Sequence, residues 1–486
     1  MRRGLVAVAF LAQATLAACI DLAPRYHRPA PPIPITFPAG PAYPASAVPE
    51  RPAVGWRDFF SDPKLQTVID QALANNRDLR IAVANVAVAR AQYDVQRGYL
   101  LPTITLDASA TYARIPSSAV GGGAFGAVGG ARAFNEKLFS LTAGTTAYQL
   151  DLFGKIRDLT GAAQARYFAT RQARDAAQIT LVSEVAADYL AIGADRAQLA
   201  IADDTQRSSE ATLAVIRQRF GAGVSSGLDV SQAETIVQQS RFDVERLTTQ
   251  IAQDRNALDL VVGSPVGDAL LPTSVDGSVV VLEQLPSALS SSVLLVRPDV
   301  LEAEELLRAD NMNIGAARAA FFPSIELTGE GGLTSTALSA LFRGAAATWT
   351  FAPTVSQTLF DAGINRGNLE VAKAQRQFGI AEYEKAIQTA FREVADALAE
   401  RGTIDGQLAA QQSLTDAWAT NLRIYAARYE RGADTYLNYL IAQRAYYNAR
   451  QTLVATELAK QTNLVTLYAV LGGGLNGPAA TPTAEH

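Results

Sequence analysis

The chain has 486 residues, of which 49% are hydrophobic and 18% charged, and its formal net charge is −5. This weakly acidic balance argues against nucleic acid as a partner. The only two histidines are His27 and His486, so a histidine-based metal or catalytic site is not expected. Walker A and H-E-x-x-H motifs are also absent. We therefore expect a protein that is not an enzyme and needs no cofactor.

The first 18 residues have the features of a secretion signal. A basic start is followed by an apolar stretch to Ala18, too short to cross a bilayer as a helix. Leu16-Ala17-Ala18-Cys19 resembles the lipobox of bacterial lipoproteins. Cys19 is the only cysteine and cannot form an internal disulfide. We expect residues 1–18 to be removed and Cys19 to carry a covalent lipid; Ile20, rather than Asp, after it favours the outer membrane.

A proline-rich segment follows the lipidation site. Ten prolines lie between Pro24 and Pro52, which predicts an extended, polyproline-like tether. We assign residues 19–60 to this lipid-anchored segment. The Gly/Pro/Ala-rich end of the chain, residues 472–486, is expected to be disordered.

Four stretches have the pattern of β-strands, near residues 102–113, 139–152, 323–331 and 347–360. In the first, Ile104, Leu106 and Tyr112 share one face, with threonine, serine and aspartate on the other. Such alternation fits a half-buried soluble sheet or a membrane barrel with a wet lumen, and does not distinguish them. Membrane strands need about 9–11 residues, and membrane barrels have about eight strands or more. If these strands cross a bilayer, the chain must oligomerise.

Long helical tracts separate and follow the strands. The tract from Gly154 to Phe220 contains no proline, and about 65 residues at ~1.5 Å each would extend roughly 100 Å. Val244, Leu247, Ile251, Leu258 and Val261 have the 3-4 spacing of a coiled-coil seam. Short glycine-containing turns, at residues 221–223 and 430–433, predict antiparallel helical hairpins.

The sequence also repeats itself. Residues 98–104 recur as residues 319–325, and Arg219-Phe220 with Gly223 recurs as Arg428-Tyr429 with Gly432, 209 positions later. The two offsets, 221 and 209 positions, are similar over half a chain and indicate a duplicated fold. We expect one repeat at 61–262, a connecting segment at 263–298 and a second repeat at 299–471.

Several motifs carry a family resemblance. Gly55-Trp56-Arg57-Asp58-Phe59-Phe60, residues 75–80, 150–155 and 315–325, and Tyr383-Glu384-Lys385-Ala386 resemble the outer-membrane factor (outer membrane efflux protein) family, in its OprM-like lipoprotein branch. The resemblance implies an α+β membrane protein. Three subunits, each giving four strands, would form a twelve-stranded β-barrel continued by an α-helical barrel across the periplasm.

The same resemblance implies a function. The homotrimer would be the passive exit duct of a tripartite efflux pump, with a periplasmic adaptor and an inner-membrane transporter of the RND (resistance-nodulation-division) type as partners and drugs or other small molecules as cargo. Positions matching the narrow periplasmic end, and so candidates for a gate, are Phe220, Leu228, Tyr429, Leu437, Ile441 and Arg444. Ile441 stands where relatives carry an aspartate and Glu430 where they carry a basic residue, so cation selectivity from an acidic ring is not carried over.

Other functions remain open at this point. The exit channel of a type I protein-secretion system has the same architecture. A lipid-anchored periplasmic structural coiled coil would need neither alternating strands nor an oligomer. A lipoprotein enzyme would need a catalytic constellation that the sequence does not offer.

Overall fold

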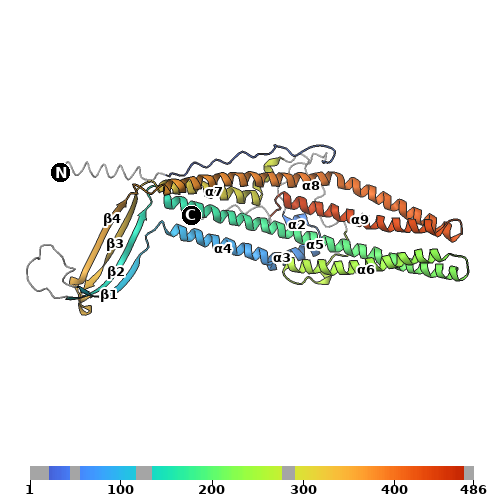
Figure 1. Ribbon diagram of the computed structural model, residues 1–486, viewed down its shortest axis with the longest axis horizontal. Coiled ribbons are helices and arrows are strands. Elements are labelled where there is room, and N and C mark those ends of the chain that lie inside the picture. The colour runs from blue at the N-terminus through green and yellow to red at the C-terminus, as the bar shows by residue number, and fades with distance from the viewer. Residues whose placement is uncertain (1–20, 44–54, 116–133, 276–289, 475–486) are drawn as a thin grey trace, which may run out of the picture. The chain divides into compact units, whose positions relative to one another are not determined.

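The computed structural model describes residues 21–43, 55–115, 134–275 and 290–474 (Figure 1). The expected signal, Cys19 and most of the expected tail lie outside the described residues. The chain forms two compact units. The first comprises Met1–Arg28, Ala87–Phe168 and Glu305–Ala381, and the second comprises Pro29–Val86, Ala169–Glu304 and Glu382–His486.

Helices and strands follow one another in two similar series. In chain order they are α2 (Trp56–Phe59), α3 (Pro63–Asn75), α4 (Arg77–Gly98), β1 (Thr105–Ile115), β2 (Phe134–Leu150), α5 (Lys155–Gly221), α6 (Gly227–Val262), α7 (Pro298–Ala319), β3 (Ser324–Ser335), β4 (Ala347–Ser356), α8 (Ile364–Glu430) and α9 (Tyr436–Val470). Helices α4, α5 and α6 have 22, 67 and 36 residues. Helices α7, α8 and α9 have 22, 67 and 35. No described helix combines the length and the hydropathy needed to cross a membrane.

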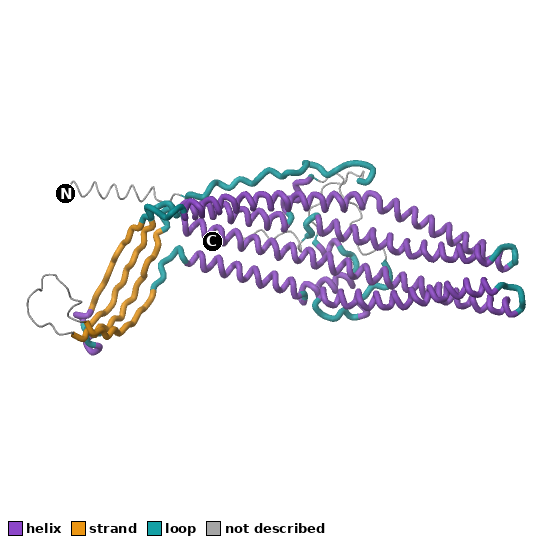
Figure 2. Tube along the Cα trace, in the orientation of Figure 1, coloured by secondary structure: helices purple, strands orange, loops and turns teal. Residues whose placement is uncertain are grey.

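The first unit contains one antiparallel sheet, drawn in orange in Figure 2, with the strand order β1-β2-β3-β4, as labelled in Figure 1. The register places side chains of like character on the same face of all four strands. The apolar face carries Leu106, Ala108, Ala110, Phe139, Leu141, Ile325, Leu327, Trp349, Phe351 and Val355, and the polar face carries Thr105, Asp107, Ser109, Ser140, Thr142, Glu326, Glu330, Thr350 and Thr354. The predicted alternation is thus confirmed, and the apolar face is open: Trp349 is 80% exposed.

Strand β2 differs from its expected bounds. It begins at Phe134, because Asn135, Glu136 and Lys137 continue the pairing with the end of β1. A register shift then occurs between Thr145 and Tyr148, where Ala147 has a positive φ of 57°. Such a bulge adds a residue to one strand and bends it.

Small residues bring α5 and α7 together within the first unit. Ala162, Ala165 and Ala309 form a buried cluster that Met312 covers. A Cβ on Gly161 would lie 2.6 Å from the Met312 sulfur, so a larger residue there would require the flexible Met312 side chain to move.

The second unit holds the main hydrophobic core. Trp56, Phe60, Ile69, Tyr189 and Leu258 are almost completely buried in it. The expected extended segment, 19–60, therefore ends before helix α2, whose residues belong to this core.

The proline-rich segment is extended but not free. In the second unit, Phe37 stacks on Phe391 with 4.9 Å between ring centroids, and the Ser291 N–H donates to the Ile35 carbonyl oxygen at 2.9 Å. Residues 29–43 therefore lie against the helices instead of forming a free tether.

Candidate functional site at the helix tips

The two long hairpins, α5–α6 and α8–α9, both reverse direction within the second unit and use the same type of turn. In the turn after α5, Gly223 has a φ of +75°, and the Val224 N–H donates to the Arg219 carbonyl oxygen at 2.9 Å. Helix α8 ends with Gly432 at +70°, with the equivalent bond from Ala433. Both are Schellman caps, which favour glycine at the left-handed position. The predicted glycine turns are confirmed.

Local hydrogen bonds cap the N-termini of α6 and α9, the helices that follow the two turns. Ser226 and Asp229 form a capping box at the start of α6, which satisfies two otherwise unpaired N–H groups. At the start of α9, Asp434 accepts hydrogen bonds from the Asn438 side chain at 2.6 Å and the Thr435 N–H at 2.8 Å. These bonds, together with Arg428, hold the pKa of Asp434 below its ordinary value. Each hairpin therefore has its own local capping network.

An apolar cluster joins the two hairpins near their tips. Leu213 and Ile216 of α5 and Ala233, Ile236 and Val237 of α6 pack with Tyr436 and Leu440 of α9. Three tyrosines extend the cluster: Tyr429, Tyr436 and Tyr439 lie with ring centroids 5.5–6.1 Å apart. Burial, with Tyr439 and Tyr429 nearby, raises the pKa of Tyr436 well above its ordinary value.

Arg219 makes a further contact between the hairpins. Its guanidinium, at the end of α5, lies over the Tyr429 ring of α8, 5.0 Å from the centroid. A cation–π contact of this kind is worth about 0.5–1 kcal/mol at an exposed site. Arg219 was visible in the sequence as half of a repeated Arg-aromatic pair, but the pairing across hairpins was not. It is a site residue that sequence reasoning missed.

The structure places all six gate candidates in the last turn of one helix or the first turns of the next. Phe220 and Tyr429 lie in the closing turns of α5 and α8, and Leu228 in the first turn of α6. Leu437, Ile441 and Arg444 follow on successive turns of α9. Four of the six have large exposed apolar side chains: Phe220, Leu228, Leu437 and Ile441 are 48–65% exposed. Only Tyr429 joins the aromatic cluster.

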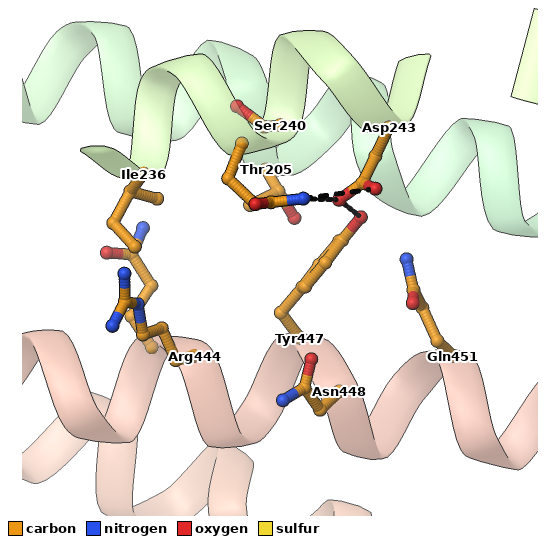
Figure 3. A pocket seen from close by; sticks show the side chains of 10 residues that line it. Thr205, Ile236, Ser240, Asp243, Arg444, Tyr447, Asn448 and Gln451 are labelled. Atoms are coloured by element: carbon orange, nitrogen blue, oxygen red, sulfur yellow. Dashed lines mark hydrogen bonds between the residues drawn. The ribbon is translucent and has the colours of Figure 1, made fainter. Parts of the chain in front are cut away.

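A polar cavity of about 440 Å³ lies between α5, α6 and α9 (Figure 3). Across it, the Tyr447 hydroxyl of α9 donates to the buried Asp243 carboxylate of α6 at 3.0 Å. Gln443, on the same side as Tyr447, donates to Ser209 of α5 at 3.3 Å. These two bonds connect the α5–α6 and α8–α9 hairpins on the side of the apolar cluster that is farther from the turns.

Arg444 lies at the cavity and has no ion-pair partner among the described residues. No three histidine, cysteine, aspartate or glutamate side chains in the described part of the chain are grouped to hold a metal ion. The tip can therefore pack, hydrogen-bond and present apolar or cationic groups, but it offers no catalytic arrangement.

The chain thus combines an antiparallel sheet that has one open apolar face with two long helical hairpins. The family model described as outer membrane efflux protein matches residues 68–264 and 289–473. The toluene efflux pump outer membrane protein TtgI of Pseudomonas putida is 41% identical over 93% of this chain and 95% of its own length. The cation efflux system protein CusC of Escherichia coli is 37% identical over 96% and 98%.

Solved structures agree with the sequence comparison. A membrane protein from Pseudomonas aeruginosa superposes with a TM-score of 0.85 at 37% identity, covering 94% of this chain and 99% of that one. The open state of the MtrE outer membrane channel of Neisseria gonorrhoeae gives a TM-score of 0.81 at 34% identity, covering 93% and 98%. The chain belongs to the outer membrane efflux protein family. It is a transport protein of the outer membrane and not an enzyme, and the expected α+β, mostly helical fold is confirmed.

Proposed function

We propose that the chain works as a homotrimer whose twelve strands close an outer-membrane β-barrel. The observation that carries this proposal is the four-stranded sheet. It has one apolar and one polar face, and β1 and β4 each pair on one side only among the described residues. Unpaired backbone groups in hydrocarbon cost several kcal/mol each, so both edges require partners from other subunits.

Two apolar stripes on the helices support the same assembly. Ile81, Val88 and Val95 recur every seventh residue on α4, and all are more than half exposed. Ile364, Val371 and Phe378 do the same on α8. Heptad stripes pack against other helices. A second copy of the chain offers the complementary stripe, and three copies would continue the barrel as a ring of helices.

The equal helix lengths support a duplicated architecture. Each half runs from a 22-residue helix through a strand pair to a 67-residue helix and then to one of 36 or 35 residues. Because the Schellman caps at Gly223 and Gly432 also correspond, we treat 61–262 and 299–471 as equivalent repeats. A trimer of two repeats would present six similar hairpins in a ring.

In this assembly the protein is a passive duct. Cargo would enter at the hairpin tips and leave through the barrel, with a periplasmic adaptor docked on the tips and an inner-membrane transporter supplying energy. Relatives bear names that mention toluene, solvents, antibiotics and cations. For this chain we propose drugs or other small molecules as cargo, with selection by the transporter.

A gate at the tips fits the side chains found there. Three copies of Leu228 and Leu437 would form an apolar constriction, which excludes water when it is narrow. Phe220 and Ile441 would extend it, Tyr429 would hold the hairpins together and Arg444 would add a cationic ring. Replacing Leu437 by glycine together with Tyr429→Ala should raise single-channel conductance while trimers still form. Unchanged conductance in assembled trimers would place the seal elsewhere.

We also propose that Cys19 is the mature N-terminus and carries lipid, since it is the chain's only cysteine and follows a lipobox-like sequence. Mass spectrometry of protein extracted from membranes tests this directly. An unmodified Cys19, or a retained signal, would reject it. Cys19→Ser should reduce processing and membrane attachment more than barrel formation by correctly exported chains.

Matched strand variants test the trimer. Trp349→Asn places a polar side chain on the apolar face, whereas Thr350→Asn places the same side chain on the polar face. Native mass spectrometry should show trimers for the wild type and for Thr350→Asn, and a much lower trimer yield for Trp349→Asn. A stably inserted wild-type monomer would contradict the assembly.

The export function needs a cellular test. Deleting the gene should increase susceptibility to small toxic compounds, and a plasmid copy should restore tolerance. If susceptibility stays unchanged while a secreted protein is lost from the medium, the duct serves protein secretion instead.

A further inference from the structure

The first described residues of the chain lie along helix α7 of the first unit and are held there through their backbone. The Arg318 guanidinium donates to the Leu22 carbonyl oxygen at 2.9 Å. The Asn311 amide donates to the Pro24 carbonyl oxygen at 2.6 Å. The chain segment that begins two residues after Cys19 is therefore docked on the helices.

Gly315 lets this segment approach closely. A Cβ at that position would lie 2.6 Å from the Ala23 backbone nitrogen and would also collide with the Asp158 carboxylate of α5. Asp158 and the docked segment are thus on the same side of α7, in direct proximity.

The Asp158 carboxyl sits in an unfavourable place for a charge. The residue is 6% exposed, and its buried Oδ2 has no hydrogen-bond partner among the described residues. The groups that face it are two other acids, Asp21 of the docked segment and Asp151 before α5, and the cation Arg157. Arg157 is engaged with Asp151, at 3.2 Å. On α7, Arg318 is engaged with the backbone of the docked segment.

These surroundings raise the pKa of Asp158 to about 7. Burial is the largest cause, followed by the charge of Asp21 and the hydrogen bond with it and by the charge of Asp151, while Arg157 opposes them. The Asp21 and Asp158 carboxyls can make a hydrogen bond only when one of them carries a proton.

We propose that the segment after the lipidation site docks on α5 and α7 in a proton-dependent manner, through a proton shared by the Asp21 and Asp158 carboxyls. When the proton leaves, two carboxylates face each other and repel, and the segment loosens. This device links the attachment of the lipid-bearing end to external pH, and it does not depend on what the channel transports.

The sign of the pH dependence follows from the two states. In the docked state the pKa of Asp158 is about 7, and release of the segment lowers it, because the burial that the segment provides and the charge of Asp21 are both removed. Docking is therefore strongest at acidic pH and weakens as the pH rises toward 7. Above that it changes little, because both states are then ionised. Between pH 5 and pH 8 the docking constant should fall on the order of 10- to 100-fold.

A spin label on the segment measures this directly. Arg25 has an exposed side chain, so Arg25→Cys carries the label without touching the proposed contact. Mass spectrometry must show one label per chain. Electron paramagnetic resonance of the trimer should show a mainly immobile label at pH 5 and a larger mobile fraction at pH 8.

Three variants make the test specific. Asp158→Asn and Asp21→Asn each replace a carboxylate by an amide that can donate permanently, so the label should stay immobile at both pH values. Asp94→Asn removes an exposed acid on α4 and should leave the wild-type response unchanged. Asp21→Asn remains informative if Asp158→Asn does not fold. Two results would overturn the proposal. One is a label on the wild-type chain that has equal mobility at pH 5 and pH 8, and the other is a wild-type pH response in both Asp158→Asn and Asp21→Asn.

Discussion

Arg219→Gln should increase the open probability of the channel. The substitution removes the guanidinium over the Tyr429 ring and so cuts a contact between the α5–α6 and α8–α9 hairpins. Glutamine has nearly the helix propensity of arginine, so α5 should keep its length. The hairpin-closing bonds at Gly223 use backbone atoms and should persist.

The size of the effect follows from the geometry. One exposed cation–π contact is worth about 0.5–1 kcal/mol. In a trimer that opens all three tips together, the loss is about 1.5–3 kcal/mol, which shifts the ratio of closed to open channels by roughly 10- to 150-fold. Single-channel recording in planar bilayers measures this ratio, with native mass spectrometry to verify the trimer.

Arg217→Gln is the matched control. Arg217 pairs with Glu234 of the same hairpin, at 2.7 Å, and both side chains are largely exposed. Such a surface pair contributes about 0–1 kcal/mol and does not join the two hairpins. An Arg219→Gln trimer with wild-type open probability would refute the reasoning. An equal increase from Arg217→Gln would show that any change near the tip opens the channel.

Two further substitutions test how the helices and the N-terminal segment are held. Tyr447→Phe removes the hydroxyl that donates to a buried carboxylate and should lower the free energy of unfolding by about 1–3 kcal/mol. Tyr446→Phe is the control, because the described contact of Tyr446 is made by its ring, and it should change the free energy of unfolding little. Equal changes in the two variants would contradict the role of the Tyr447 hydroxyl. Gly402→Ala adds a Cβ that collides with the Ala42 carbonyl oxygen, so hydrogen exchange of residues 35–43 should accelerate. Gly406→Ala adds a Cβ in open space on the same helix and should stabilise it by about 0.5–1 kcal/mol; slower or unchanged exchange in Gly402→Ala would contradict the close approach.

The strands and turns could be predicted because each depends on local chemistry. Alternation with period two fixes which side chains share a face of the sheet. The sequence therefore predicted that Trp349 and Phe351 lie on the face opposite to Thr350. Glycine at the end of a long proline-free tract similarly predicts a left-handed cap, as found at Gly223 and Gly432.

The start of β2 was harder to predict, because Asn135, Glu136 and Lys137 weaken the alternation. Their pairing depends on the opposite strand, and the Lys137 ammonium lies 6.0 Å from the Tyr112 ring centroid across the hairpin. Sequence reasoning also missed that the proline-rich segment is docked. Proline content predicts extended backbone but says nothing about what it lies against. One of the features that receive the segment is a single glycine, Gly402, in the middle of a long helix.

At the tip, too, the sequence does not show which side chains meet across the two hairpins. The contacts within each hairpin and those between hairpins have different chemistry. Within each hairpin, backbone caps and ion pairs such as that between Arg241 and Glu210, at 2.7 Å, are formed by residues close along one pair of antiparallel helices. Between hairpins, the contacts are one small apolar cluster, the Arg219 contact, the Gln443–Ser209 and Tyr447–Asp243 hydrogen bonds, and the Arg450–Asp204 ion pair at 3.4 Å. The contacts within a hairpin resist separation of its two helices, because breaking the caps leaves backbone groups at the helix ends unpaired. The contacts between the two hairpins can be exchanged for contacts to a partner helix at little cost in free energy. A structure divided in this way can open at its tips while each hairpin stays folded, which is what a gated duct requires.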